Sequence, residues 1–338
     1  MSQDGEERGS ERTQVAETTA RREALLLAAL LAALYGVLVA APLVRGVPPV
    51  AGGVAVTVLF AAAALGIAAL GARVRLGPPG ELVSMVLALG LWWAVGGLGE
   101  REGTVRLLAL PGADVIFVLA CVLAGRLLSR IVRERNIMLP IAIVLALTDV
   151  FTVFVGPVAL ALTHAPELVE QLSMKLPEVG SAAGPEGAAG LSHFATLGLG
   201  DIIFAALLLA GAARFGLNFR ATFWWILGTV VVGLALFVAV PGIPPMPVLP
   251  LMAIAFLIAN RGRFELSREE RRITIVAFIF VGALLAGLGV LAHMLVARLP
   301  APPPETPPAV EQPQSSDAAQ PQSPAVEQPQ SPDAAQPQ

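Results

Sequence analysis

The sequence predicts an all-α polytopic membrane protein with about nine transmembrane helices. Of its 338 residues, 56% are hydrophobic and only 14% are charged, whereas a typical soluble domain has about 25% charged residues. The mean hydropathy is +0.75, and because residues 299–338 are polar, the rest of the chain is more apolar than this average. These observations exclude a soluble globular fold.

The apolar stretches are long enough for helices to cross a hydrocarbon core of about 30 Å, which takes roughly 20 residues. The first follows a charged tail, 1–23, and is too long for the apolar part of a signal peptide. The stretches form a four-helix region at 24–128, a core at 137–260 and a final span, and the third and eighth are short. The nine predicted spans are 24–45, 50–72, 82–98, 107–128, 137–163, 190–213, 221–240, 245–260 and 273–297.

The basic residues predict how the spans are oriented, because Lys and Arg stay on the cytoplasmic side during insertion. If the N-terminus is cytoplasmic, that side carries seventeen Lys and Arg residues and the other side five. The bias is strongest in the connections near 126–135 and 261–272. The sequence therefore predicts a cytoplasmic N-terminus and an external C-terminus. Arginine outnumbers lysine by 21 to one, which favours a GC-rich prokaryotic source and hence a prokaryotic plasma membrane.

Two segments are predicted to lie outside the membrane. The loop 164–189 carries four Glu and one Lys around a Gly-Ser-Ala stretch, which indicates a flexible exterior segment. The tail 299–338 is rich in Pro, Gln and Ser, and its segment 309–324 recurs from Ala325 with a period of 16. Such a composition has too few apolar side chains to fold, so we expect a disordered, polyproline-like tail.

Three carboxylates lie inside the predicted spans: Asp114, Asp149 and Asp201. An Asp at the centre of a spanning helix costs roughly 2.5–3.5 kcal/mol on insertion scales, so such an acid usually marks a function. Asp114 follows Pro111 and Gly112 near the beginning of its span, and we interpret it as a helix-start or interfacial residue. Asp149 and Asp201 lie near the middle of consecutive, antiparallel spans, so their carboxylates can face each other.

Two facing carboxylates in a low-dielectric site cannot both ionise, so the pair holds one shared proton near neutral pH. One carboxylate can then activate a water as general base, while its protonated partner polarises a peptide carbonyl and later protonates the leaving nitrogen. That is the chemistry of an aspartic protease. The same acids also fit a proton or cation relay, or a buried pair that only holds two helices together. The carboxylates alone leave all three interpretations open.

Residues around the acids favour the protease. Gly198 and Gly200 lie within one turn before Asp201, where missing side chains allow close backbone approach and local unwinding. Prolines at the start of the eighth span free carbonyls that can line a cavity or pair with a guest chain. A helical substrate must be opened into an extended strand before attack, and bound strands are commonly held by main-chain pairing. These prolines are Pro241, Pro244, Pro245, Pro247 and Pro250.

With these motifs the chain resembles the presenilin and signal peptide peptidase family of intramembrane aspartyl proteases. The segment Leu147–Phe154, which contains Asp149, is similar to the family's first motif, Tyr-Asp in a hydrophobic helix. Gly198-Leu199-Gly200-Asp201 matches the second motif, Gly-x-Gly-Asp, in full, and the preceding His193–Leu197 is similar to the signal peptide peptidase branch. Pro247-Val248-Leu249 resembles the third motif, Pro-Ala-Leu. Their order along the chain makes the combination specific.

The resemblance implies a presenilin-like catalytic core over 137–260, with Asp149 and Asp201 as the catalytic pair and the glycine and Pro247–Leu249 motifs as substrate-binding or supporting residues. It implies an intramembrane-cleaving aspartic endopeptidase without cofactor, metal or nucleic acid, acting in the lipid bilayer on transmembrane helices or remnant signal peptides. The sequence departs from the family at Thr148, where the family has tyrosine, and at Val248, where it has alanine. The acids also fall one span earlier than is usual in the family.

The predicted orientation adds an expectation about substrates. With a cytoplasmic N-terminus, the loop joining the two Asp helices is external, as in signal peptide peptidase and opposite to presenilin. By analogy, substrates are expected to have cytoplasmic N-termini, as leftover signal peptides do. The family also suggests that Ser173–Pro177 in this loop forms a strand that pairs with substrate through Lys175 and Leu176, and an amphipathic linker is the alternative.

Rival chemistries have weaker support. The histidines, including His193 next to Ser192, lack the His-Glu-x-x-His spacing of a zinc protease, and the single cysteine, Cys121, excludes a multi-cysteine metal site. A serine protease would need a nucleophile and a base, and Ser192 beside His193 is the one suggestive pair. We interpret this pair as a coincidence, because adjacent residues of a helix point about 100° apart. A proton-coupled carrier that uses the same two acids is the alternative function. Carriers also have broken helices, but no internal inverted repeat is evident in the sequence.

Overall fold

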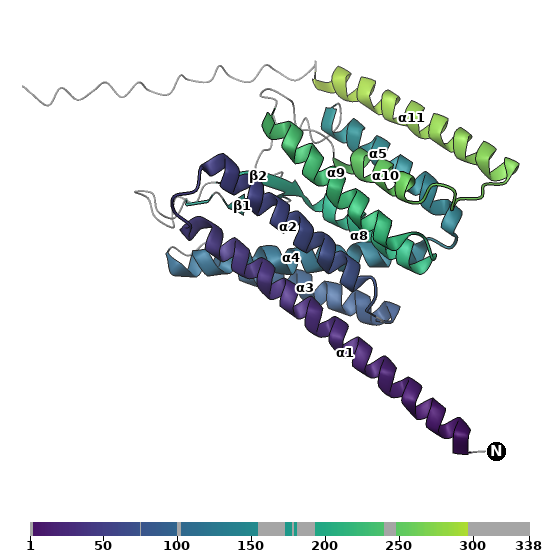
Figure 1. Ribbon diagram of the computed structural model, residues 1–338. Helices are drawn as coiled ribbons and strands as arrows, with labels where there is room; N and C mark the ends of the chain where they lie inside the picture. Colours follow the sequence, from purple (N-terminus) through teal and green to yellow (C-terminus); the bar gives the residue numbers. More distant parts are fainter. Residues whose placement is uncertain are drawn as a thin grey trace, which may run out of the picture. The chain divides into compact units, whose positions relative to one another are not determined.

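The computed structural model describes residues 3–74, 76–99, 103–154, 173–177, 179–180, 193–239 and 248–296. They form nine helices of ten or more residues, two 3₁₀ helices and one two-stranded sheet (Figure 1). The 3₁₀ helices are η1 (Ala41–Leu43) and η2 (Arg135–Ile137). The longer helices are α1 (Gln3–Ala40), α2 (Pro49–Gly71), α3 (Pro78–Leu98), α4 (Thr104–Ile131), α5 (Met138–Phe154), α8 (Leu199–Arg214), α9 (Phe219–Ala239), α10 (Val248–Ala259) and α11 (Arg268–Val296).

Six of these helices are long and apolar enough to cross a membrane: α1, α2, α3, α4, α9 and α11. The prediction of a polytopic helical protein is confirmed at this level. In the described residues the other three helices, α5, α8 and α10, have 17, 16 and 12 residues. At 1.5 Å per residue, the 16 residues of α8 reach about 24 Å, less than a hydrocarbon core of about 30 Å. The described parts of the sequence motifs lie on or next to these three helices.

The prediction of a helical span over 190–213 is wrong in its first half. Residues His193–Gly198 form strand β2, and α8 begins only at Leu199. Gly198 has an extended backbone, with φ −72° and ψ 141°, and glycine favours neither helix nor strand interiors, so the change from strand to helix falls there. Asp201 therefore lies in the first turn of α8 instead of at the centre of a long helix.

Strand β1 (Ser173–Pro177) pairs with β2 in the antiparallel direction. Leu176 lies opposite Ala195, and the register becomes irregular between Leu176 and Pro177, because proline has no amide to donate to the ladder. The strand that the family resemblance suggests at 173–177 is present, and this one sheet is a departure from an all-α fold. The rest of the predicted exterior loop 164–189, except 179–180, and the whole tail 299–338 lie outside the described residues.

Three helix boundaries differ from those predicted. Helix α1 begins at Gln3, so the helix extends through most of the charged tail predicted at 1–23. Helix α3 begins at Pro78, a residue well suited to the first helical turn, and its 21 residues make the third span full-length. The interpretation of Asp114 as a helix-start residue is wrong, because α4 begins at Thr104, almost three turns earlier.

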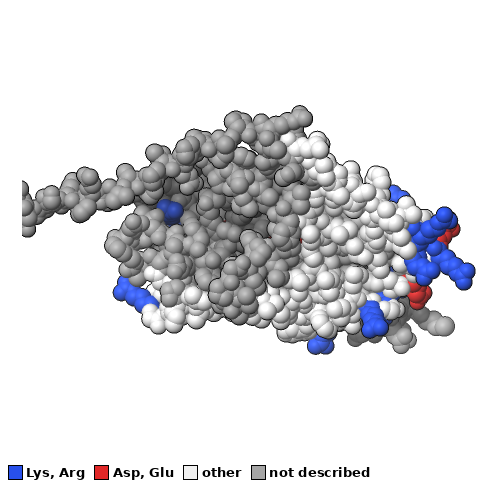
Figure 2. Space-filling view, turned by 90° about the horizontal axis from the view of Figure 1, so that it is seen from above, with Lys and Arg blue, Asp and Glu red and all other residues white. Residues whose placement is uncertain are grey.

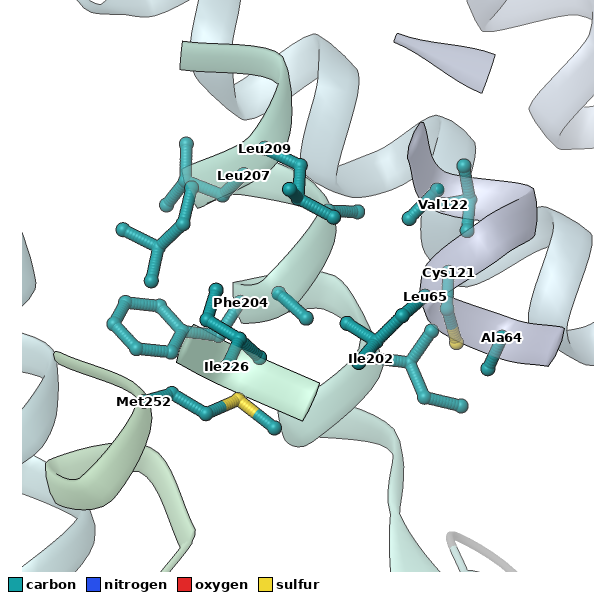
Figure 3. Close-up of a cluster of buried hydrophobic side chains, with 14 of the residues drawn as sticks. Ala64, Leu65, Cys121, Val122, Ile202, Phe204, Leu207, Leu209, Ile226 and Met252 are labelled. Atoms are coloured by element: carbon teal, nitrogen blue, oxygen red, sulfur yellow. The ribbon is translucent and has the colours of Figure 1, made fainter. Parts of the chain in front are cut away.

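The core forms where α2, α4 and α8 pack together, with α9 and α10 against α8. Figure 3 shows side chains of all five helices in one cluster, in which Ile202 of α8 lies near Leu65 and Cys121. Gly125 of α4 is the closest point, because a Cβ atom added there would lie 2.4 Å from the carbonyl oxygen of Ile203. Helix α10 in turn contacts both α5 and α9 (Figure 1). This packing holds α8 against α4 and brings α10 alongside α5.

Basic side chains gather at one end of the helices. Figure 2 shows most of the visible Lys and Arg side chains at one edge of the face in view. Next to this edge, much of the described surface is uncharged. Hydrogen bonds join the chain segments at this end: Arg214 donates to the carbonyl of Ser129 at 2.6 Å, and Asn136 donates to the carbonyl of Glu265 at 3.1 Å. The end of α4, the end of α8 and the segment before α11 therefore lie together, as the charge bias of the sequence requires.

Candidate active site

Asp149 lies on α5, less than two turns before the last described residue of that helix, Phe154. The main-chain amide of Leu249 donates to its Oδ2 at 3.2 Å. Leu249 is in the first turn of α10, where helix amides have no partner within the helix and the helix dipole favours negative charge. The hydroxyl of Thr148, the residue before Asp149, donates to the carbonyl of Val144 on its own helix at 2.9 Å.

Asp201 lies at the third position of α8. Its carboxylate interacts with the main chain of Gly198, the residue that precedes the helix, as the acidic member of a capping box does. Asp201 also lies close enough to Asp149 for the two carboxylates to interact electrostatically. The structure therefore brings the two predicted acids together. They meet through the first turn of α8, not through the middle of two spanning helices.

A cavity of about 60 Å³ lies beside Asp201. Its walls come from α2, α8, α9 and α10, and among the described residues Asp201 is the one charged residue that lines it. The α2 wall is formed by small side chains, among them Ala61, Ala64 and Ala68, and Met252 of α10 lies across from them (Figure 3). A cavity of this size has room for water next to a carboxylate.

The third predicted motif lies partly inside the described residues. Val248 and Leu249 begin α10, and Val248 lines the cavity beside Asp201. Pro247 lies outside the described residues, as do Pro241, Pro244 and Pro245. Pro250 falls in the first turn of α10, where proline removes no intrahelical hydrogen bond.

The predicted substrate strand contacts the rest of the fold through Leu176, which is 1% exposed and belongs to the main core. Any contact of Leu176 with substrate would therefore use its main chain. Lys175 pairs in register with Thr196 of β2, and its side chain lies outside what the structure describes. Strand β2 continues directly into Gly198 and α8, so the sheet leads into the turn that holds Asp201.

Sequence reasoning missed a buried ion cluster at the other end of α8. It assigned Arg126 and Arg130 to a connection, but both lie on α4. Both donate to Glu81, in the first turn of α3: Arg126 through Nε at 3.0 Å and also through Nη2, Arg130 through Nη2 at 2.8 Å. The carboxylate of Glu81 is fully buried. The spacing of four between the two arginines, which places them on one helix face, was the signal available in the sequence.

In the described part of the chain, no group of three or more His, Cys, Asp or Glu residues is placed to hold a metal ion. Cys121, the single cysteine, is buried in the core, as expected of a packing residue. No protein-family model, curated protein or solved structure matches this chain. The arrangement that remains is two interacting carboxylates, one of which receives a helix amide while the other borders a water-sized cavity.

Proposed function

We propose that the protein is an intramembrane-cleaving aspartic endopeptidase with Asp149 and Asp201 as its catalytic pair. The observation that carries this proposal is that α5, α8 and α10 bring these two carboxylates and the amide of Leu249 close together, with Asp201 bordering a cavity. All three sequence motifs of the presenilin and signal peptide peptidase family contribute to that one place, although they lie about 50 residues apart along the chain.

The chemistry follows from the pair sharing one proton. The ionised carboxylate takes a proton from a water held in the cavity, and the water oxygen attacks the carbonyl carbon of the scissile peptide bond. The protonated carboxylate donates to the carbonyl oxygen as the tetrahedral intermediate forms. The C–N bond then breaks as a proton passes to the leaving nitrogen, and the pair again holds one proton. The hydrogen bond from Leu249 stabilises negative charge on Asp149.

The substrates in this proposal are transmembrane helices or remnant signal peptides with cytoplasmic N-termini. The enzyme sits in a prokaryotic plasma membrane with its own N-terminus inside. A substrate opened into an extended strand can add to an edge of the β1–β2 sheet through main-chain hydrogen bonds, and β2 would then guide it to the turn that holds Asp201. The core over 137–260 is the presenilin-like catalytic part.

The test is cleavage of a single-span reporter by the full-length protein reconstituted in liposomes. We expect Asp149→Asn and Asp201→Asn each to lower the cleavage rate by about 10²–10⁴-fold, the range for losing a general acid or base. Asp114→Asn is the matched control, because it also neutralises a carboxylate inside a predicted span but lies on α4, outside the proposed pair. Unimpaired cleavage by either of the first two variants would overturn the assigned pair.

A proton-coupled carrier is the second candidate, favoured by the same interacting acids next to a cavity and by the shortness of α8. Broken helices and midplane acids are also found in carriers. Proton flux measured in the same liposomes separates the two candidates. Flux that requires both Asp149 and Asp201, without any reporter cleavage, would replace the protease by the carrier. Reporters inserted in both orientations test the expected substrate direction.

A further inference from the structure

A second, larger cavity of about 750 Å³ lies at the other end of α8 from Asp201. Its walls come from the connection between α2 and α3, the first turn of α3, the last turns of α4 and the end of α8. Asp201 and Arg214 mark the two ends of α8, and their separation of 13 residues corresponds to about 20 Å along the helix. The proposed catalytic pair therefore takes no part in this second site.

The cavity is strongly basic. Among the residues that the structure describes, four arginines and one carboxylate line it, and these five side chains have a net formal charge of +3. The carboxylate, Glu81, is already bound by Arg126 and Arg130. In the described part of the chain, the other two arginines have no carboxylate partner. They are Arg73 and Arg214.

The structure holds these two arginines in place without neutralising them. Arg214 donates through Nη1 to the carbonyls of Ser129 and Val132, at 2.6 and 2.9 Å. The guanidinium of Arg73 lies over the ring of Phe219, 5.1 Å from its centre. Neutral carbonyls and an aromatic face orient a guanidinium but leave its charge uncompensated. An arginine oriented in this way is prepared to receive a phosphate oxygen, for which its planar fork is well matched.

We propose that this basic cavity binds a phosphate group. Its position favours the phosphate of an anionic lipid headgroup, because the cavity lies at helix ends and at the arginine-rich end that the charge bias predicts to be cytoplasmic. Basic pockets between transmembrane helices on that side are suited to anionic headgroups. Apolar side chains next to the cavity in sequence are exposed, as lipid-facing residues are: Leu128 is 44% and Ile131 is 74% exposed. A soluble phosphate compound offers the same chemistry and is the other source.

The test measures binding of phosphatidylglycerol and phosphatidylcholine to the full-length protein in detergent, by native mass spectrometry. We expect the wild type to retain phosphatidylglycerol in preference to phosphatidylcholine. The double variant Arg73→Gln/Arg214→Gln should bind phosphatidylglycerol about 10- to 30-fold more weakly, since each arginine near an anionic surface contributes about a factor of five. The control, Arg268→Gln/Arg272→Gln, removes two exposed arginines of α11 and should leave binding within about twofold of wild type.

Excess inorganic phosphate distinguishes the two sources. Lipid binding that persists in its presence assigns the cavity to the headgroup, whereas competition by phosphate assigns it to a soluble phosphate compound, and both outcomes support a phosphate site. Equal loss in the two double variants, or no loss in Arg73→Gln/Arg214→Gln, would overturn it. Because Arg214 also bonds main-chain carbonyls, Arg73→Gln alone is measured too. A thermal unfolding midpoint like that of the wild type shows that this single variant is folded, and its affinity should still fall severalfold.

Discussion

The main-chain amide of Leu249, in the first turn of α10, donates a hydrogen bond of 3.2 Å to Oδ2 of Asp149 on α5. The two residues are 100 positions apart in the sequence. The contact uses an amide that the first turn of any helix leaves without an intrahelical partner, so it follows from where α10 begins. It also connects the third sequence motif to the acid of the first motif, in agreement with a supporting role of α10 at the proposed site.

Replacing Leu249 by proline tests this hydrogen bond. Proline removes the amide donor but is tolerated in the first turn of a helix, so α10 should still form. A hydrogen bond to a charged group contributes about 1.5–3 kcal/mol, and we expect reporter cleavage to fall by about 10- to 100-fold. Leu249→Ala keeps the amide and should retain most activity. If Leu249→Ala loses as much as Leu249→Pro, the leucine side chain is the important group and the amide is not.

The small side chains of α2 that line the cavity beside Asp201 give a second prediction. Ala64→Leu adds three carbon atoms to a wall of a space of about 60 Å³, so it should displace the water that the mechanism needs. Overpacking of this kind costs about 1–3 kcal/mol of stability. We expect cleavage to be lost while the protein still folds, as measured by reporter assay and thermal unfolding. Ala55→Leu, at an exposed position of the same helix, is the control and should cleave normally.

The close approach of α4 and α8 at Gly125 gives a third prediction. A Cβ atom there would lie 2.4 Å from the carbonyl oxygen of Ile203 and 2.9 Å from the amide nitrogen of Leu207, and backbone atoms cannot move aside as a flexible side chain can. Gly125→Ala should therefore push α8 away from α4 and lower the thermal unfolding midpoint, at a cost of about 3 kcal/mol, the upper part of the overpacking range.

Gly97 of α3 provides the matched control for that substitution. Nothing lies within 4 Å of a Cβ atom added there, and alanine is favoured over glycine in a helix by about 1 kcal/mol. Gly97→Ala should therefore leave the unfolding midpoint unchanged or raise it slightly. An unchanged midpoint for Gly125→Ala would contradict the close packing of α4 and α8.

Hydrophobicity was enough to locate all nine α-helices of ten or more residues that the described residues contain, because a run of apolar residues can be recognised without knowing what packs against it. The boundaries of α8 were not predictable in the same way. The segment 190–198 is apolar enough to continue a helix, but His193–Gly198 pairs with Ser173–Pro177, a contact that no local pattern encodes. The sequence therefore identified the two acids, but it did not predict the strand that ends at Gly198, just before the helix turn that carries Asp201.

The buried cluster around Glu81 was missed for a related reason. An acid four residues after Gly77, at the beginning of an apolar stretch, has the pattern of an exposed helix-start residue. Whether it is buried depends on what packs against it, and here the arginines of α4 come from 45 and 49 positions away. Single-sequence patterns report which face of a helix is polar, but not which helix covers that face.

Removing Glu81 should be strongly destabilising. Glu81→Ala leaves Arg126, which is 6% exposed, as a buried charge without its carboxylate, and loss of one partner of a buried pair costs about 3–5 kcal/mol. The double variant Glu81→Leu/Arg126→Met removes both charges and should recover much of that loss, because apolar replacement of a buried pair is often close to neutral.

The exposed pair Arg135 and Glu265, 3.4 Å apart, is the control, and Glu265→Ala should change stability by less than about 1 kcal/mol. Thermal unfolding of the four proteins in one detergent measures all of these effects, and equal stability of Glu81→Ala and wild type would show that the cluster does not hold α3 to α4.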